Sequence, residues 1–152
     1  MNLRLSGPEE TEALGARFAA AGLRSGIVYL RGELGAGKTT LVRGFIRATG
    51  LSQKVKSPTY TLLEIYDGDP VVLHLDLYRL VNPAELEFVG LRDYMSMAAV
   101  WFVEWPEKGR GQLPAPDMTV SLADDGPGRI AHVDTHTGIG GEILNLIHAF
   151  NE

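Results

Sequence analysis

The sequence predicts one α/β domain over residues 1–152, in which helices flank a sheet of mixed parallel and antiparallel strands. Apolar runs of strand length alternate with segments of helical apolar spacing, which is typical of α/β domains. Turn-forming residues join two pairs of extended runs, which predicts antiparallel hairpins in the same sheet. No repeat or linker divides the chain, and 45% of its 152 residues are hydrophobic, enough for one sizeable core.

The composition excludes several classes of protein. No apolar run approaches the roughly 18–20 residues of a membrane span, and the N-terminus is too short and too acidic for a signal peptide. We therefore expect no membrane association and a cytoplasmic location. Cysteine is absent, which excludes disulfides and thiolate metal sites. The net charge of −5 argues against a nucleic-acid surface over the whole protein, although it leaves a local basic patch open.

A helix and a strand are predicted at the start of the chain. The helix runs from about Pro8 to Ala21, with Ser6 as its cap, Glu9 completing a capping box and Gly22 at its end. The run "GIVYLRG" at 26–32 follows, and its four consecutive apolar residues lie between glycines. Such a run predicts a short buried strand.

The middle of the chain alternates helical and extended segments. The segment 38–49, "KTTLVRGFIRAT", has apolar residues at helical spacing. The runs "TYTLLEIY" at 59–66 and "VVLHLDLY" at 71–78 are separated by "DGDP", so we expect an antiparallel hairpin. The segment 82–90, "NPAELEFVG", has an asparagine cap, proline in the first helical position and a glycine stop, which predicts a helix.

The last third predicts a buried strand, a second hairpin and a closing helix. The run "AAVWFVEW" at 98–105 is apolar at both odd and even positions, as expected of a strand buried on both faces of the sheet. The segment 118–135 forms the hairpin around "DDGPG", and "GEILNLIHAF" at 141–150 forms the helix. We expect helices on both faces of the sheet.

The loop between the first strand and the second helix carries the strongest functional signal. Gly32, four further residues, and then Gly37, Lys38 and Thr39 fit the pattern G-x-x-x-x-G-K-[ST] between a strand and a helix. Amides of residues 33–39 and the helix N-terminus would hold a β-phosphate, Lys38 would reach the β- and γ-oxygens, and the Thr39 hydroxyl would ligate Mg²⁺. The sequence therefore predicts a phosphate loop and a P-loop NTPase-like fold.

Two carboxylates follow apolar runs. Asp76 ends "VVLHLD" and Glu104 ends "AVWFVE". A phosphate site with Mg²⁺ needs such a group at the end of a neighbouring strand, either to hold the metal's water shell or to orient the attacking water. A solvated carboxylate at a strand end is the alternative for each, and spacing alone does not divide the two roles.

Other residues carry weaker signals. Trp105 would stack on a base or pack as lid material, and the "SPTY" segment at 57–60 would sense a γ-phosphate or form a turn. His74, inside an apolar strand, is interpreted as a satisfied core histidine in preference to a base. Arg79 and Arg129 would each either pair with the negative charge of a phosphate or be an ordinary surface arginine.

Six segments in this order and spacing resemble the bacterial TsaE family, also called YjeE, over about residues 5–135. They are "GELGAGKTTLVRGF", "VKSPTYTLLEIY", "HLDLYRL", "ELEFVGLRDYM", "VEWPEKG" and "LPAPD". The resemblance implies a compact P-loop domain that binds and hydrolyses ATP slowly by itself. It implies work with TsaD and TsaB, which transfer the threonylcarbamoyl group to tRNA. Whether tRNA touches this chain stays open, and the net charge of −5 favours an indirect contact.

The resemblance also assigns roles to residues. Thr39 and Glu104 would be the Mg²⁺ ligands, and Asp76 would be the catalytic carboxylate beside Lys38. Thr59 would belong to a switch-like segment. The expected contacts to ATP or ADP are Glu33, Leu34, Gly35, Ala36, Gly37, Lys38, Thr39, Thr40, Thr11, Trp105 and Arg129.

Two other functions compete with an ATPase. A small-molecule kinase usually has an arginine-bearing lid, and only "EKGRG" with Arg110 offers lid chemistry here. A guanine-specific GTPase carries an N-K-x-D type base reader, and none of the four lysines follows asparagine or threonine. A D-x-x-G at Asp125–Gly128 lies in a predicted hairpin turn. Both alternatives are disfavoured.

Overall fold

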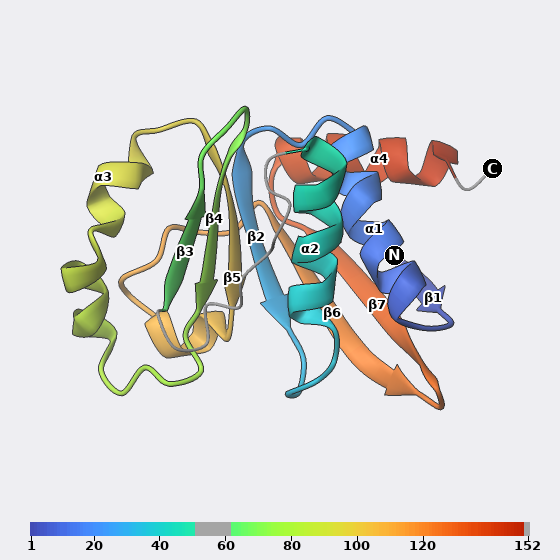
Figure 1. Ribbon diagram of the computed structural model, residues 1–152, viewed down its shortest axis with the longest axis horizontal. Coiled ribbons are helices and arrows are strands. Elements are labelled where there is room, and N and C mark those ends of the chain that lie inside the picture. The colour runs from blue at the N-terminus through green and yellow to red at the C-terminus, as the bar shows by residue number, and fades with distance from the viewer. Residues whose placement is uncertain (51–61, 151–152) are drawn as a thin grey trace.

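The computed structural model describes residues 1–50 and 62–150, and these contain one seven-stranded sheet (Figure 1). The strand order is β1-β7-β6-β2-β5-β4-β3. The strands are β1 (Asn2–Leu5), β2 (Gly26–Arg31), β3 (Leu63–Tyr66), β4 (Val71–Asp76), β5 (Ala99–Glu104), β6 (Met118–Asp125) and β7 (Gly128–Thr135).

The sheet is mixed, as the sequence predicts. Its centre is parallel, because β2 pairs with β5 and β6 and β4 pairs with β5 in the same direction. Antiparallel strands complete both edges: β3 pairs with β4 at one side, and β7 and β1 follow β6 at the other. Both predicted hairpins are confirmed over the described residues, and 59–61 of the first run lie outside them.

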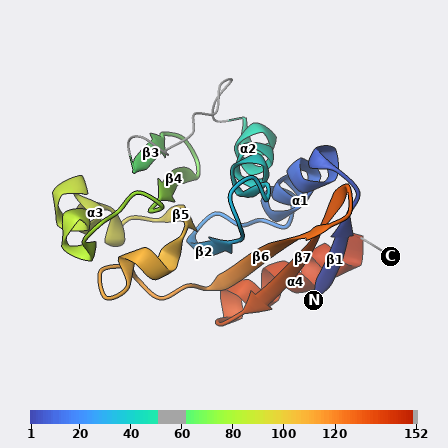
Figure 2. The same ribbon diagram turned by 90° about the horizontal axis from the view of Figure 1, so that it is seen from below.

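Helices cover both faces of this sheet, which confirms the predicted layers. Figure 2 shows α1 and α2 on one face and α4 on the other, beside β7 and β6. The helices are α1 (Pro8–Ala20), α2 (Lys38–Thr49), α3 (Leu91–Met95) and α4 (Gly138–Phe150), with 3₁₀ turns η1 (Pro83–Val89) and η2 (Pro106–Gly109). Of the described helices, none is long and apolar enough to cross a membrane.

The predicted cap of the first helix is wrong, whereas the later one is confirmed. Gly7 is the N-cap of α1 and makes no side-chain bond; the amide of Ser6 donates instead to Glu10, not Glu9. Because Pro8 takes the first helical position, Ser6 lies one residue too early to cap. Asn82 does cap η1, with its side chain accepting from Ala84 N at 3.0 Å, but the segment winds as 3₁₀ helix.

The sequence-based prediction misses the strand β1, the helix α3 and the 3₁₀ turn η2, and it makes the closing helix α4 too short. The edge strand β1 forms through its pairing with β7, about 130 positions along the chain, as in Asn2 opposite His132. The five-residue helix α3 is too short to show a periodic signal. The closing helix α4 begins at Gly138, three residues before the predicted segment.

The helices α1 and α2 pack with their backbones in contact. A Cβ added at Gly15 would lie 1.9 Å from Leu41 O, and one added at Gly44 would lie 1.8 Å from Glu12 O. Neither helix has room for a side chain at these crossing points. This close packing sets α2, and therefore the loop that precedes it, firmly against α1.

Candidate phosphate-binding site

Glycines shape the loop that connects β2 to α2. Gly32, Gly35 and Gly37 have φ angles of 147°, 80° and 106°, a region that other residues rarely adopt. At Gly32 the backbone also approaches β6, since an added Cβ would lie 2.7 Å from Leu122 O. These glycines let the chain turn back over the start of α2.

Lys38 begins α2 beneath this loop, with only 4% of its surface exposed. Its Nζ donates to Gly32 O at 2.5 Å and lies 4.1 Å from the centroid of the Trp105 ring. Burial lowers the pKa of the ammonium, whereas the nearby charges of Glu104 and Asp76 raise that pKa. The loop thus holds a desolvated cation, an arrangement that favours an anionic ligand.

The two predicted carboxylates lie side by side at the carboxyl ends of β4 and β5. Asp76 is directly opposite Glu104 in the parallel register. Thr39 Oγ1 donates to Glu104 Oε2 at 3.0 Å, and the amide of Tyr78 donates to Asp76 Oδ1 at 3.1 Å. The loop, Lys38 and both carboxylates therefore face one place.

A cleft of about 240 Å³ lies among these groups. It is bounded by most of the predicted binding residues: Leu34, Gly35, Gly37, Lys38, Thr39, Thr40, Asp76, Glu104 and Trp105. The Glu33 carbonyl accepts from the amide of Ala36 at 3.0 Å and closes a turn in the loop. The structure brings these residues together, and their roles stay predictions.

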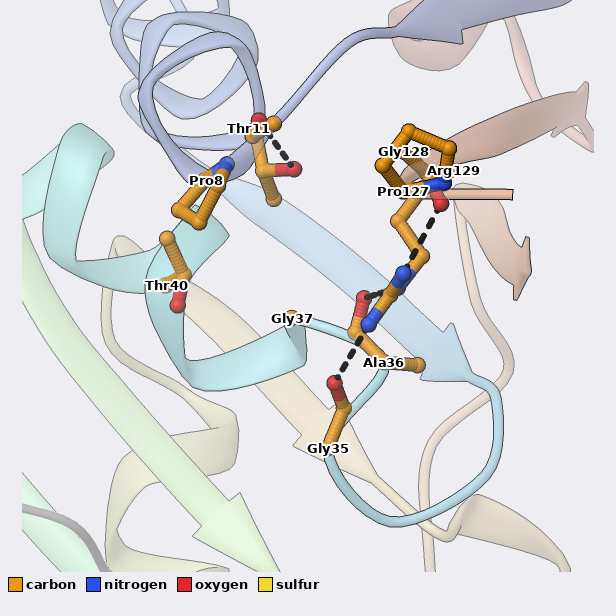
Figure 3. A pocket seen from close by; sticks show the side chains of 10 residues that line it. Pro8, Thr11, Gly35, Ala36, Gly37, Thr40, Pro127, Gly128 and Arg129 are labelled. Atoms are coloured by element: carbon orange, nitrogen blue, oxygen red, sulfur yellow. Dashed lines mark hydrogen bonds between the residues drawn. The ribbon is translucent and has the colours of Figure 1, made fainter. Parts of the chain in front are cut away.

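A second cavity, of about 120 Å³, borders the same loop at Gly35, Ala36 and Gly37 (Figure 3). Thr11, from α1, and Arg129, from β7, face it from opposite sides, and Thr40 also borders it. The Arg129 guanidinium donates to the carbonyls of Gly35 and Ala36, both at 3.2 Å. The two weaker candidates for nucleotide contact thus flank the loop outside the main cleft.

His74 is a neighbour of the site that sequence reasoning placed only in the core. It is fully buried, and its Nε2 lies 2.5 Å from Glu104 Oε2. Its Nδ1 has no partner among the described residues, so the histidine is not fully satisfied. Because a buried N–H without an acceptor is costly, we assign the proton to Nε2, which donates to Glu104. The sequence did hold one signal for this contact: His74 and Asp76 are two residues apart in a strand, so their side chains lie on the same face of the sheet.

The structure places the remaining weak candidates in different surroundings. Trp105 has φ 56° and packs its ring 5.1 Å from that of Tyr78, so it combines packing with contact to the cleft. Arg79 and Arg110 are exposed. The D-x-x-G at Asp125–Gly128 forms the β6–β7 turn. The "SPTY" segment, including Thr59, lies outside the described residues.

A comparison with family models settles the classification. The model described as "Threonylcarbamoyl adenosine biosynthesis protein TsaE" matches residues 5–131. The chain belongs to the TsaE family. Among curated TsaE proteins, that of Haemophilus influenzae is 45% identical over 126 residues, covering 82% of this chain and 78% of the relative. That of Bacillus subtilis is 37% identical, covering 78% and 75%.

A solved structure confirms the fold of this TsaE protein. The crystal structure of Bacillus subtilis YdiB superposes with a TM-score of 0.82 at 26% sequence identity, covering 100% of this chain and 96% of YdiB. The match extends over the whole mixed sheet and its helices. The P-loop NTPase-like α/β fold predicted from the loop motif is therefore correct.

Proposed function

We propose that this TsaE protein is a Mg²⁺-dependent ATPase that acts with TsaD and TsaB to form threonylcarbamoyladenosine in tRNA. The observation that carries the proposal is the meeting of a glycine-rich loop, the buried ammonium of Lys38 and the paired carboxylates Asp76 and Glu104 around one cleft. Family membership supports the pathway, and the residue-level resemblance supports the partners.

The loop is suited to hold the polyphosphate of ATP. Its amides and the N-terminus of α2 supply partial positive charge, and Lys38 supplies a full charge. Phosphate oxygens would replace Gly32 O as the acceptor of the hydrogen bond that the Lys38 ammonium donates. The second cavity beside the same loop, which Thr11 borders from α1, is assigned here to the rest of the nucleotide.

The residues present fit a magnesium ion that arrives with the nucleotide. Thr39 Oγ1 and Glu104 Oε2 are hard oxygen donors 3.0 Å apart, and Asp76 lies beside them. Within the described chain, no three His, Cys, Asp or Glu side chains gather as a metal site of their own. Mg²⁺ commonly binds through one or two carboxylates and substrate phosphates. When bound, the ion would neutralise charge that develops on the phosphoryl oxygens.

Hydrolysis would rest on positioning. Asp76 would accept a hydrogen bond from a water and hold that water in line with the γ-phosphorus. As the water oxygen bonds to phosphorus, the bond to the β–γ bridging oxygen would break and the water's proton would pass through Asp76 to the released phosphate, giving ADP and phosphate. Because such reactions depend on placement and charge, a partner that orders the site would raise a slow basal rate.

Reconstitution tests this proposal directly. Unmodified tRNA, a threonylcarbamoyl donor, TsaD and TsaB are incubated with or without this chain, and with ATP or a non-hydrolysable analogue. We expect repeated rounds of tRNA modification only with this chain and hydrolysable ATP. The same number of rounds without this chain, or with the analogue, would contradict the proposal.

A further inference from the structure

We propose that Arg129 is a positioning residue, which holds the phosphate loop in its binding shape before a nucleotide arrives. This inference rests on the proposed function and deepens it. The sequence suggested instead that Arg129 contacts the nucleotide. The geometry points to a role exerted through the loop backbone.

The guanidinium of Arg129 is engaged with main-chain oxygens (Figure 3). Nε donates to Ala36 O at 3.2 Å, Nη2 donates to Gly35 O at 3.2 Å, and Nη1 donates to Gly128 O at 2.8 Å. Asp124 adds an ion pair at 3.4 Å, and the side chain is 27% exposed. All three guanidinium nitrogens thus bond to the protein itself.

These bonds set the direction of two consecutive peptide planes. In a trans peptide, the carbonyl and the next N–H point in opposite directions. With the Gly35 carbonyl held by Arg129, the amide of Ala36 points the other way and donates to Glu33 O at 3.0 Å. With the Ala36 carbonyl held, the amide of Gly37 points away from Arg129. Gly37 also borders the main cleft.

The loop needs these hydrogen bonds from Arg129 because its glycines do not restrict its backbone conformation. Gly35 and Gly37, on either side of Ala36, have φ angles of 80° and 106°, and glycine populates positive and negative φ about equally. Unrestrained planes would therefore rotate, and the ligand would have to order them. Fixing a loop in its bound shape reduces that cost of binding.

Arg129 is anchored well enough to do this. It lies inside β7, opposite Leu5 of β1 and Asp124 of β6. The preceding Gly128 is pressed against β1, where an added Cβ would lie 2.2 Å from Leu5 O. The planar fork of arginine spans two neighbouring carbonyls, which the point charge of lysine cannot do in the same way.

The contact of Lys38 with the loop differs in kind. Its ammonium also donates to a loop carbonyl, that of Gly32, but phosphate oxygens would compete for it. The Arg129 bonds are made beside the second cavity, whose lining does not include Lys38, so they need not break when phosphate binds. A positioning role therefore predicts an effect in the nucleotide-free protein, which a direct nucleotide contact does not.

The test measures backbone order and affinity in Arg129→Ala and Arg129→Lys. We expect the ¹⁵N order parameters of Gly35, Ala36 and Gly37 in the nucleotide-free protein to fall from about 0.85 to below about 0.6. We expect the Kd values for Mg-ATP and Mg-ADP to rise together, by about 10-fold, since the ligand must then order loop backbone that Arg129 no longer holds, and ordering the backbone of one residue costs about that much affinity. Arg4→Ala is the control, because Arg4 lies on the neighbouring strand with its side chain 81% exposed and forms an ion pair with Asp125, away from the loop.

Two outcomes would overturn the inference. Weaker nucleotide binding with unchanged order parameters would make Arg129 a direct nucleotide contact. No change in either quantity would leave Arg129 without a role at the loop. If wild-type protein failed to bind Mg-ATP at all, the proposed function would fall, whereas the order parameters would still decide whether Arg129 holds the loop.

Discussion

At the scale of single residues, the site concentrates charge in a partly desolvated space. Lys38, Asp76 and Glu104 lie together because the carboxyl ends of the parallel strands β2, β4 and β5 lie at the same end of the sheet. The motif predicted Lys38, and the ends of the apolar runs predicted both carboxylates. The contact of His74 with Glu104 was not predicted, because it depends on the register of β4 against β5.

Replacement of Asp76 tests the division of roles between the carboxylates. We expect Asp76→Ala to keep Mg-ATP affinity within about threefold of wild type, because the loop and Lys38 remain. We expect turnover to fall by about 100-fold or more, since a positioned base typically contributes 10²–10⁴-fold. Phosphate release and calorimetric titration measure the two quantities. Unaltered turnover would move the catalytic role to Glu104 or to a partner.

The buried ammonium of Lys38 gives a dependence of stability on pH. Burial lowers its folded-state pKa below the unfolded value, so the unfolded chain binds more protons between those two pKa values, and stability rises with pH there. We expect wild-type protein to gain stability relative to Lys38→Met as pH rises through that window towards about 10.4. Chemical unfolding at several pH values measures the difference. A difference that stays flat would contradict the inferred pKa shift.

At the scale of elements, the crossing of α1 and α2 fixes the start of α2, where the phosphate loop ends. Gly44→Ala would force a methyl group into Glu12 O, 1.8 Å from the added Cβ. We expect it to lower the free energy of unfolding by about 1–3 kcal/mol or more. Gly141→Ala in α4 is the matched control, because no atom of the described residues lies within 4 Å of the added Cβ, and it should be neutral or stabilising by at most about 1 kcal/mol. Equal stabilities of the two variants would contradict the close packing.

The same glycines show where sequence reasoning about elements stops. Local patterns predicted β2, α2, both hairpins and the buried strand β5, because their periodicity and turn residues are contained in short windows. The need for Gly15 and Gly44 arises between two helices and leaves no local trace. The strand β1 was missed for the same reason, since only its distant partner β7 makes it a strand.

At the scale of the whole molecule, nucleotide state should control assembly. The cleft lies at the carboxyl ends of β4 and β5, where they meet the phosphate loop. Bound ATP and bound ADP would therefore present different surfaces to a partner at this end of the sheet. We expect affinity for the TsaD–TsaB complex to differ among the ATP-analogue, ADP and nucleotide-free forms. Surface plasmon resonance with each form measures this. Equal affinities in all three forms would rule out control by nucleotide.

The most direct test of the central claim is calorimetric titration of Mg-ATP into wild-type protein and into Lys38→Ala. In the proposed complex Lys38 would donate a charged hydrogen bond to the phosphates, and such a bond contributes about 1.5–3 kcal/mol. We therefore expect saturable binding at one site in wild-type protein and a Kd about 10- to 100-fold higher in the variant. Equal affinities, or no binding to wild-type protein, would contradict the claim that this loop holds a triphosphate.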